Sequence, residues 1–126
     1  MRRFLFYHLI IVSMLALVSS TNAQTYFEYT GHWYKVISIP ENTTWHQCRD
    51  SATTLGGYMA TATTAQENDF IASLISPNES FLGGTDELQE GNWGWITGEV
   101  WDFTAWRSGE PNNHWSDEDY IGLDPD

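Results

Sequence analysis

The most informative part of the sequence begins at residue 81. It runs Phe81-Leu82-Gly83-Gly84-Thr85-Asp86, continues through Glu90-Gly91-Asn92-Trp93-Gly94-Trp95, and ends in Gly109-Glu110-Pro111-Asn112-Asn113. Short apolar pieces alternate here with Gly, Asp, Asn and Pro, a pattern typical of short strands joined by long loops. Strands are predicted over 81–82, 93–96, 100–106 and 120–123.

Two amphipathic helices are predicted upstream of this stretch. Thr43 or Thr44 is expected to cap the first, and Gly56-Gly57 to end it. Its apolar residues stand at helical spacing: Trp45, Cys48, Ala52 and Leu55. The second helix starts at the capping box Thr64-Ala65-Gln66-Glu67 and ends before Pro77. Its expected buried stripe is Phe70, Ile71, Leu74 and Ile75.

The segment before the helices is aromatic and β-branched. Residues 32–37 read His-Trp-Tyr-Lys-Val-Ile, which predicts one strand ended by Pro40. One strand, two helices, then short strands and loops predict an α+β fold.

The amino terminus has the pattern of an export signal. Arg2 and Arg3 precede an apolar run over 4–18, and Thr21-Asn22-Ala23 forms a small-residue cleavage site. A retained membrane anchor would need a longer span than these roughly fifteen residues. We expect 1–23 to be a signal peptide, 24–31 a short lead and 32–126 the folded domain. The protein is then secreted, extracellular and not inserted in a membrane after signal removal.

Composition and charge exclude several classes of protein. The formal net charge of the chain is −12, and it falls to −14 without residues 1–23. Such a charge argues against nucleic acid and anionic lipid as partners. Hydrophobic residues at 41% and aromatic residues at 15% are too many for a disordered acidic tail. The mature length supports one small domain.

Acidic and amide side chains concentrate in the loop half of the chain. They are Asp86, Glu87, Glu90, Glu99, Asp102, Glu110, Asp117, Glu118 and Asp119, interleaved with Asn112 and Asn113. Oxygen donors of this kind are those that Ca²⁺ prefers, although a solvated acidic surface has the same composition. No EF-hand loop is present. Zinc is also not expected, because the mature histidines stand apart from any second His or Cys at ligand spacing.

The order and spacing of these motifs closely resemble the C-type lectin domain family, especially its mannose-binding members. The resemblance runs from about His32 to the end of the chain. It also includes Cys48, Gly98, Trp106 and Glu118-Asp119. It implies a C-type lectin-like fold, with two helices packed on short antiparallel strands and long calcium-binding loops. The implied function is calcium-dependent binding of mannose-, fucose- or N-acetylglucosamine-type sugars.

The resemblance also implies which residues hold the ions. The sugar-binding calcium site would use Glu110, Asn112 and Glu118, which also bind the carbohydrate. A neighbouring calcium site would use Asp86, Glu90, Asn113, Glu118 and Asp119. Asn113 stands where close relatives carry an acid, and Pro111 would follow a cis peptide bond. By the same resemblance, Glu-Pro-Asn selects mannose-type sugars and Gln-Pro-Asp selects galactose-type sugars.

Cys48 is the only cysteine of a chain that is expected to be exported. It could be an inert buried thiol, pair with another chain, or lack a partner because the sequence stops early. The resemblance favours the last alternative, because it places a further cysteine, a Trp-Asn-Asp segment and a final strand after Leu123. Tyr120 stands where the family has another cysteine. We therefore expect an incomplete, one-disulfide lectin domain.

Two other functions compete with sugar binding. Glu110 and Glu118 could form the acid and base pair of a glycosidase, but the surrounding loop offers no apolar pocket to raise one pKa. A lectin-like module could also bind protein, ice or mineral without recognising sugar. The sequence contains no collagen-like or coiled-coil segment that would build an oligomer, and it predicts no oligomeric state.

The tryptophans are expected to be core residues more often than sugar platforms. The core set is Trp33, Trp45, Trp93, Trp95, Trp101 and Trp106. Trp115, within the expected ligand loop, is predicted to be exposed.

Overall fold

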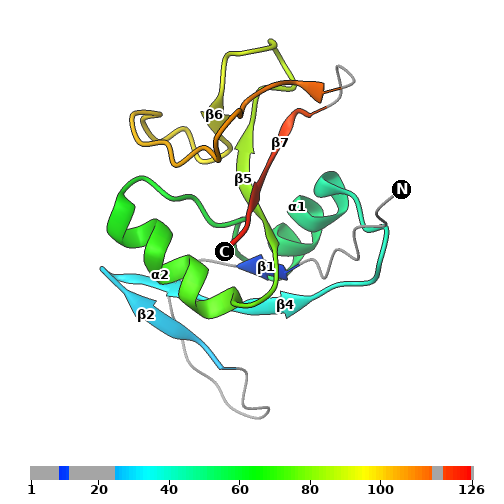
Figure 1. Ribbon diagram of the computed structural model, residues 1–126. Helices are drawn as coiled ribbons and strands as arrows, with labels where there is room; N and C mark the ends of the chain where they lie inside the picture. The colour runs from blue at the N-terminus through cyan, green and yellow to red at the C-terminus, as the bar shows by residue number, and fades with distance from the viewer. Residues whose placement is uncertain (1–8, 12–24, 115–117, 126) are drawn as a thin grey trace.

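The computed structural model describes residues 9–11, 25–114 and 118–125. The elements in chain order are β1 (Leu9–Ile11), β2 (Phe27–Tyr29), β3 (His32–Tyr34), β4 (Val36–Ser38), α1 (Trp45–Thr54), α2 (Ala65–Ile75), β5 (Ser80–Thr85), β6 (Gly94–Trp95) and β7 (Tyr120–Leu123). Two helices and short antiparallel strands confirm the predicted α+β class. In Figure 1, α1 and α2 lie on opposite sides of β5 and β7, and the loop half extends beyond them.

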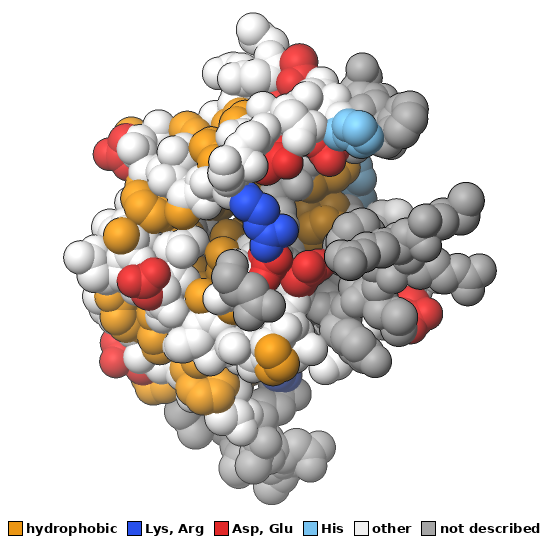
Figure 2. Space-filling model, viewed as in Figure 1, with side chains coloured by type: hydrophobic (Ala, Val, Ile, Leu, Met, Phe, Trp, Pro, Cys, Tyr) orange, Lys and Arg blue, Asp and Glu red, His pale blue; other side chains and the backbone are white. Residues whose placement is uncertain are grey.

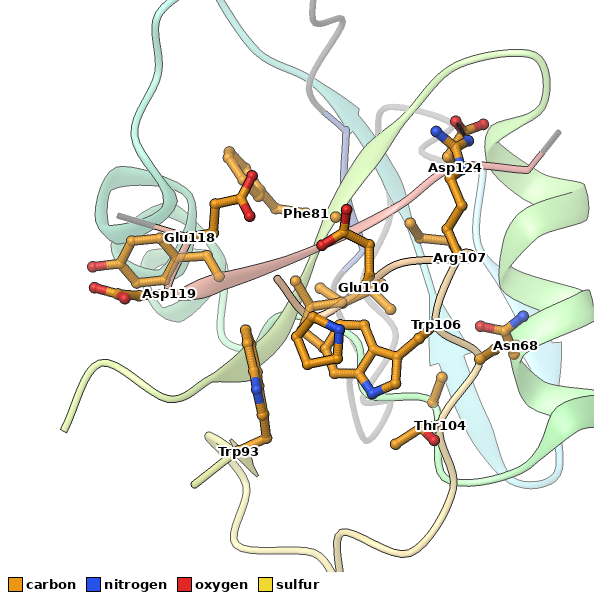
Figure 3. Close-up of a pocket in the computed structure, with 18 of the residues that line it drawn as sticks. Asn68, Phe81, Trp93, Thr104, Trp106, Arg107, Glu110, Glu118, Asp119 and Asp124 are labelled. Atoms are coloured by element: carbon orange, nitrogen blue, oxygen red, sulfur yellow. Dashed lines mark hydrogen bonds and ion pairs between the residues drawn. The ribbon is translucent and has the colours of Figure 1, made fainter. Parts of the chain in front are cut away.

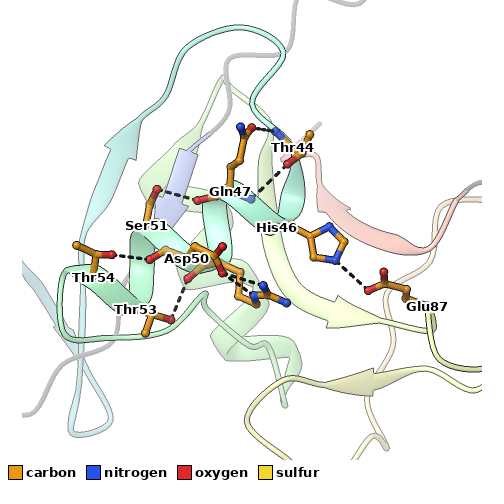
Figure 4. Close-up of polar contacts among 9 residues, drawn as sticks. Thr44, His46, Gln47, Asp50, Ser51, Thr53, Thr54 and Glu87 are labelled. Atoms are coloured by element: carbon orange, nitrogen blue, oxygen red, sulfur yellow. Dashed lines mark hydrogen bonds and ion pairs between the residues drawn. The ribbon is translucent and has the colours of Figure 1, made fainter.

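The first helix begins as its sequence predicts. The hydroxyl of Thr44 accepts from the backbone N–H of Gln47, and the Gln47 side chain accepts from the Thr44 N–H (Figure 4). The chain leaves the helix at Gly56, with φ +84°. Trp45, Cys48 and Ala52 are buried as expected, but Leu55 is 43% exposed, because it follows the last helical turn.

The second helix keeps only half of its predicted capping box. The Thr64 hydroxyl accepts from the Glu67 N–H at 3.1 Å. The Glu67 carboxylate turns away from Thr64 and accepts from the Thr63 N–H at 2.8 Å and from the Tyr34 hydroxyl at 2.7 Å. This carboxylate thereby joins α2 to β3. Ile71 and Ile75 are buried, whereas Phe70 and Leu74 are half-buried.

The strand predicted over 32–37 is split at Lys35. β3 pairs with β2 and β4 pairs with β1, so each half belongs to a different two-stranded sheet. The predicted strand over 100–106 is absent among the described residues. The ring of Trp101 instead packs against Trp95 of β6, and the ring of Trp106 packs against Trp93. The apolar residues of this segment therefore make ring contacts rather than a strand.

β5 is the central strand of a three-stranded sheet in the order β6-β5-β7. Both neighbours are antiparallel to it, with Gly84 opposite Trp95 and Thr85 opposite Tyr120. Its two glycines allow close packing. A Cβ on Gly83 would lie 2.9 Å from the Met59 carbonyl oxygen, and one on Gly84 would lie 2.8 Å from the Ile121 side chain.

Buried side chains form two clusters, one on each side of this sheet. One contains Tyr34, Ile71, Ile75, Leu82 and Trp95 together with Ala60 and Ala62. The other contains Trp45, Cys48, Ala52 and Met59. Cys48 is a fully buried free thiol in the described structure, and burial raises its pKa to about 11. The disulfide expected for Cys48 stays a prediction.

β1 comes from the segment that the sequence predicts to be a signal peptide. It pairs antiparallel with β4, and Leu9 lies opposite Ser38. The remainder of 1–23 lies outside the described residues, so signal removal stays a prediction. The described helices include none that is long and apolar enough to cross a membrane.

The Tyr34 hydroxyl offers a direct test of how α2 is attached. Burial, followed by the hydrogen bond to Glu67, raises the Tyr34 pKa above its ordinary 10.0. Replacing Tyr34 by Phe should lower the free energy of unfolding by about 1 to 3 kcal/mol, because Glu67 loses a donor. Urea unfolding measures this effect. Tyr29→Phe, which keeps the stacked contact with Phe70, is the control.

The pH dependence follows from the same shift. Because the pKa of Tyr34 is higher in the folded than in the unfolded chain, its contribution to the free energy of unfolding is fully present below the unfolded pKa of about 10. This contribution is lost as the pH rises above that value. The alkaline decline of stability should therefore be shallower in Tyr34→Phe than in the unchanged chain. Parallel declines would contradict the assignment.

Candidate functional site

A cavity of about 720 Å³ opens between the long loop after β6 and the edge formed by β5 and β7. One wall is aromatic, with Trp93, Trp101 and Trp106. The other wall is acidic and contains Glu90, Glu110, Glu118 and Asp119. Figure 3 shows Glu110 and Glu118 on one side and Trp93 and Trp106 on the other. Figure 2 shows acidic side chains beside a basic one in the middle of the face that is viewed.

The aromatic wall is built by tryptophan rings that pack on one another. The Trp101 centroid lies 4.5 Å from that of Trp95 and 6.1 Å from that of Trp93. Trp106 meets Trp93 edge to face, with 5.0 Å between centroids. Offset and edge-to-face contacts of this kind are favourable. They fix the path of a loop that has no regular secondary structure over residues 98–107.

An ion pair closes the loop onto β7. The Arg107 guanidinium donates to the carboxylate of Asp124, just beyond the strand. The Glu110 N–H then donates to the Arg107 carbonyl at 2.9 Å, which turns the chain. These two contacts bring the Glu-Pro-Asn segment to the mouth of the cavity.

Glu110 and Asn112 flank a cis peptide bond between Glu110 and Pro111. This confirms the cis geometry expected at Pro111. Both side chains turn to the same side, because the Asn112 amide donates to the Glu110 carboxylate at 2.7 Å. Glu110 and Asn112 are exposed, so both can reach a ligand in solvent.

A second group of candidate residues lies beside the first. The Asn113 amide donates to the Glu90 carboxylate, and its carbonyl oxygen accepts from the Glu118 N–H at 3.4 Å. The Glu118 carboxylate accepts from the His114 N–H at 2.8 Å. Asn113 therefore links the loop after β5 to the chain that enters β7.

Asp86 and Asp119 belong to the same end of the sheet. Asp86 donates its N–H to the Asp119 carbonyl at 3.2 Å, and one of its carboxylate oxygens accepts from Gly91 at 2.8 Å. The other oxygen, Oδ1, is buried and has no hydrogen-bond partner among the described residues. A buried carboxylate oxygen without a donor is unfavourable, and a cation would satisfy it.

The structure thus brings all seven predicted ligands to one end of the sheet, in three hydrogen-bonded groups. Within the described ranges no three His, Cys, Asp or Glu side chains form a cluster that could hold a metal ion. The candidate sites instead mix carboxylates with the amides of Asn112 and Asn113. Such oxygen donors, together with the unsatisfied Asp86, fit calcium.

The predictions for the tryptophans hold in part. Trp33 is 38% exposed rather than part of the core, because the hairpin of β2 and β3 turns one face to solvent. Trp45 and Trp95 are buried, and Trp115 lies outside the described residues. Glu99, one of the acidic residues of the loop half, accepts from the hydroxyls of two threonines.

Sequence reasoning also missed Arg107. Its role depends on Asp124, which is seventeen residues away. The only available signal was that Arg107 is one of three basic residues after the predicted signal peptide.

Comparison with known proteins identifies the family. The model of the Lectin C-type domain matches residues 41–121, which is more than half of the chain. The chain belongs to the C-type lectin domain family. Proteins of this family are non-enzymatic carbohydrate-binding proteins, so the glycosidase alternative is dropped.

Individual relatives of this lectin domain agree with the family match. Lectin BRA-3 of Megabalanus rosa is 36% identical over 94 residues, covering 73% of this chain and 56% of the relative. A perlucin-like protein of Mytilus galloprovincialis is 28% identical over 80 residues, covering 59% of this chain and 51% of the relative. The chain therefore spans only about half the length of these two proteins.

A solved structure confirms the C-type lectin fold. It is the cow C-type carbohydrate-recognition domain of CD23, crystallised in the presence of a GlcNAc2Man3 oligosaccharide. The TM-score is 0.63 at 25% identity, with 66% of this chain and 64% of the other chain covered.

The aromatic wall should be needed for the order of the loop. Replacing Trp101 by Ala in this lectin domain removes contacts with Trp93, Trp95 and Trp106. The free energy of unfolding should fall by about 2 to 4 kcal/mol. Trp33→Ala, a change at an exposed ring, should cost less than about 1 kcal/mol. Urea unfolding followed by near-UV circular dichroism distinguishes them, and equal losses would show that the wall has no special role.

Proposed function

We propose that this domain binds sugars with mannose-type vicinal hydroxyls in a calcium-dependent manner, through Glu110, Asn112 and Glu118. The observation that carries the proposal is the pair Glu110 and Asn112. Their exposed side chains meet at 2.7 Å on either side of a cis peptide bond. An acceptor that lines the cavity and a donor bonded to it are thus held side by side.

The chemistry of a vicinal diol matches this pair. Each hydroxyl has one proton to donate and two lone pairs to offer. The Glu110 carboxylate accepts a hydrogen bond from one hydroxyl, and the Asn112 amide donates a hydrogen bond to the other. Glu110, Asn112 and Glu118 would hold the calcium ion, which would supply an electrostatic contact to the oxygens of the diol. Glu118, the third residue of the proposed sugar site, would accept the hydrogen bond from the second hydroxyl.

The other acidic residues serve the calcium ions, and among them Glu118 also serves the sugar. Glu118 is held by the His114 N–H and lines the same cavity as Glu110. Asp86, Glu90, Asn113 and Asp119 would form the neighbouring site with Glu118. Neutralising this cluster relieves repulsion between carboxylates in a chain whose net charge is −12.

The relatives support the same ligand class. One of them carries the name lectin, and the CD23 domain was crystallised with an oligosaccharide that contains mannose and N-acetylglucosamine. Export by the segment 1–23 is part of the proposal, and it places the domain outside the cell. Millimolar Ca²⁺ is available there and matches the affinity of many extracellular calcium modules, about 10⁻⁴ to 10⁻³ M.

Calcium should stabilise the loop half of the domain. Millimolar Ca²⁺ at neutral pH should raise the melting temperature of the full chain by about 5 °C, because the ion binds only the folded state. Acid should abolish the shift, since protonated carboxylates are poor ligands. Differential scanning calorimetry with Ca²⁺, Mg²⁺ and chelator measures the effect.

Two variants make the calcium experiment specific. Glu118→Gln should lose most of the calcium shift. Glu41→Gln removes an equally exposed acid from the turn before α1 and should keep it. A shift no larger than that given by Mg²⁺ would rule out the calcium site.

The order of Glu110 and Asn112 should set which sugars bind. Exchanging them for the galactose-type order, Glu110→Gln with Asn112→Asp, keeps the net charge. Each mismatched hydroxyl then leaves a polar group unsatisfied, at about 1 to 3 kcal/mol. Calcium-dependent retention on mannose resin should fall relative to galactose resin. The same exchange at the exposed pair Glu41 and Asn42 is the matched control, and an unchanged mannose preference of the site variant would refute the assignment.

A further inference from the structure

The loop that carries Glu110 and Asn112 is fixed at its start by contacts that the binding function does not use. Its first residue, Ile96, donates its N–H to the Gly83 carbonyl at 2.8 Å, and Gly98 donates to Trp95 at 2.9 Å. Beyond Gly98 the chain runs without regular secondary structure as far as residue 107. A contact that fixes the chain near Gly98 therefore determines the path of the irregular segment that follows it.

Glu99 is the residue at that point. Its Oε2 accepts from the Thr61 hydroxyl at 2.7 Å and from the Thr97 hydroxyl at 2.6 Å. Charge-assisted hydrogen bonds of this kind are stronger than those between neutral groups. One partner is local, but Thr61 lies 38 residues earlier in the chain.

Thr61 is part of the rigid interior. It is 5% exposed, and its neighbour Ala60 accepts a hydrogen bond from Gly83 of β5 at 2.8 Å. The Glu99 carboxylate therefore ties the loop to the segment that packs directly on the central strand. The loop begins from a fixed point rather than from a mobile turn.

The path from this point to the candidate ligands is continuous. Trp101 follows Glu99 by two residues and packs on Trp95 and Trp93. Trp106 packs on Trp93 and Trp101, and Glu110 follows after the turn at Arg107. Glu99 itself does not line the cavity, whereas Glu90, Glu110 and Glu118 do. Its charge is directed to the hydroxyls and not to an ion.

We propose that Glu99 is a positioning residue, which holds the loop 96–113 through Thr61 and Thr97 so that Glu110 and Asn112 are in place before a ligand arrives. The expected effect of this positioning is a higher affinity for Ca²⁺, and that effect rests on the proposed function. The ordering of the loop in the absence of any ion is independent of that function. The two claims can therefore be tested separately.

Hydrogen exchange of the full chain in chelator tests the ordering. Glu99→Ala should speed exchange in the loop 96–113 about tenfold or more, while α2 and β5 keep their protection. Glu99→Gln should restore most of the protection, because its amide oxygen still accepts from a hydroxyl. Asp102→Ala removes an exposed acid from the same loop and should leave exchange unchanged.

Calcium titration of the same variants tests the consequence. Glu99→Ala should weaken Ca²⁺ binding about tenfold, as loss of a residue that supports ligands commonly does. Glu99→Gln and Asp102→Ala should stay within about threefold of the unchanged chain. Thr61→Val removes the distant hydroxyl at nearly constant volume, and its effect should not add to that of Glu99→Ala.

Each outcome decides one claim. Unchanged loop exchange in Glu99→Ala, or equal effects in Asp102→Ala, would overturn the positioning role. Faster exchange with unchanged Ca²⁺ affinity would overturn the predicted effect on calcium binding, and it would confirm that Glu99 orders the loop. If the unchanged chain binds no Ca²⁺, the proposed function fails, and the exchange data still decide whether Glu99 orders the loop.

Discussion

Close packing of the chain around β5 determines how the other elements are arranged. Side chains at residues 83 and 84 would collide with Met59 and Ile121, so the two glycines let the neighbouring chain segments approach the strand. β6 and β7 pair with its two edges, and Ala60 accepts from Gly83. Asp86 directly follows β5, and its N–H donates to Asp119 in the chain that enters β7. The candidate site lies where the loop after β5, the loop after β6 and the chain that enters β7 meet.

This arrangement concentrates acid at one end of the sheet, and the described contacts offset only part of the cost. Amide groups satisfy some carboxylates, as in the contacts of Asn113 with Glu90 and of His114 with Glu118. Arg107 neutralises Asp124. Asp86 keeps a buried oxygen that has no donor in the described part of the chain. A domain with this charge is therefore expected to gain stability from a divalent cation, which links its stability to ligand binding.

Sequence patterns predicted the local elements better than the contacts between them. Helix starts at Thr44 and Thr64 follow from capping chemistry over four residues, and they were confirmed. The Glu67 side chain could not be placed from its own helix, because its partner Tyr34 lies 33 residues earlier. Residues 100–106 have the apolar content of a strand, yet ring packing holds them as a loop. The seven candidate ligands came from motif resemblance, whereas Glu99 and Arg107 required knowledge of distant partners.

The most direct test of the account follows the side-chain amides of Asn112 and Asn113 by ¹⁵N–¹H correlation spectroscopy. Ca²⁺ is added to the full chain first, and methyl α-mannoside second. We expect the resonances of both amides to shift with Ca²⁺ and that of Asn112 to shift again with the mannoside, while the resonance of the Asn42 amide, on the turn before α1, stays in place. An Asn112 amide that ignores Ca²⁺, or a mannoside shift that persists in chelator, would contradict this expectation.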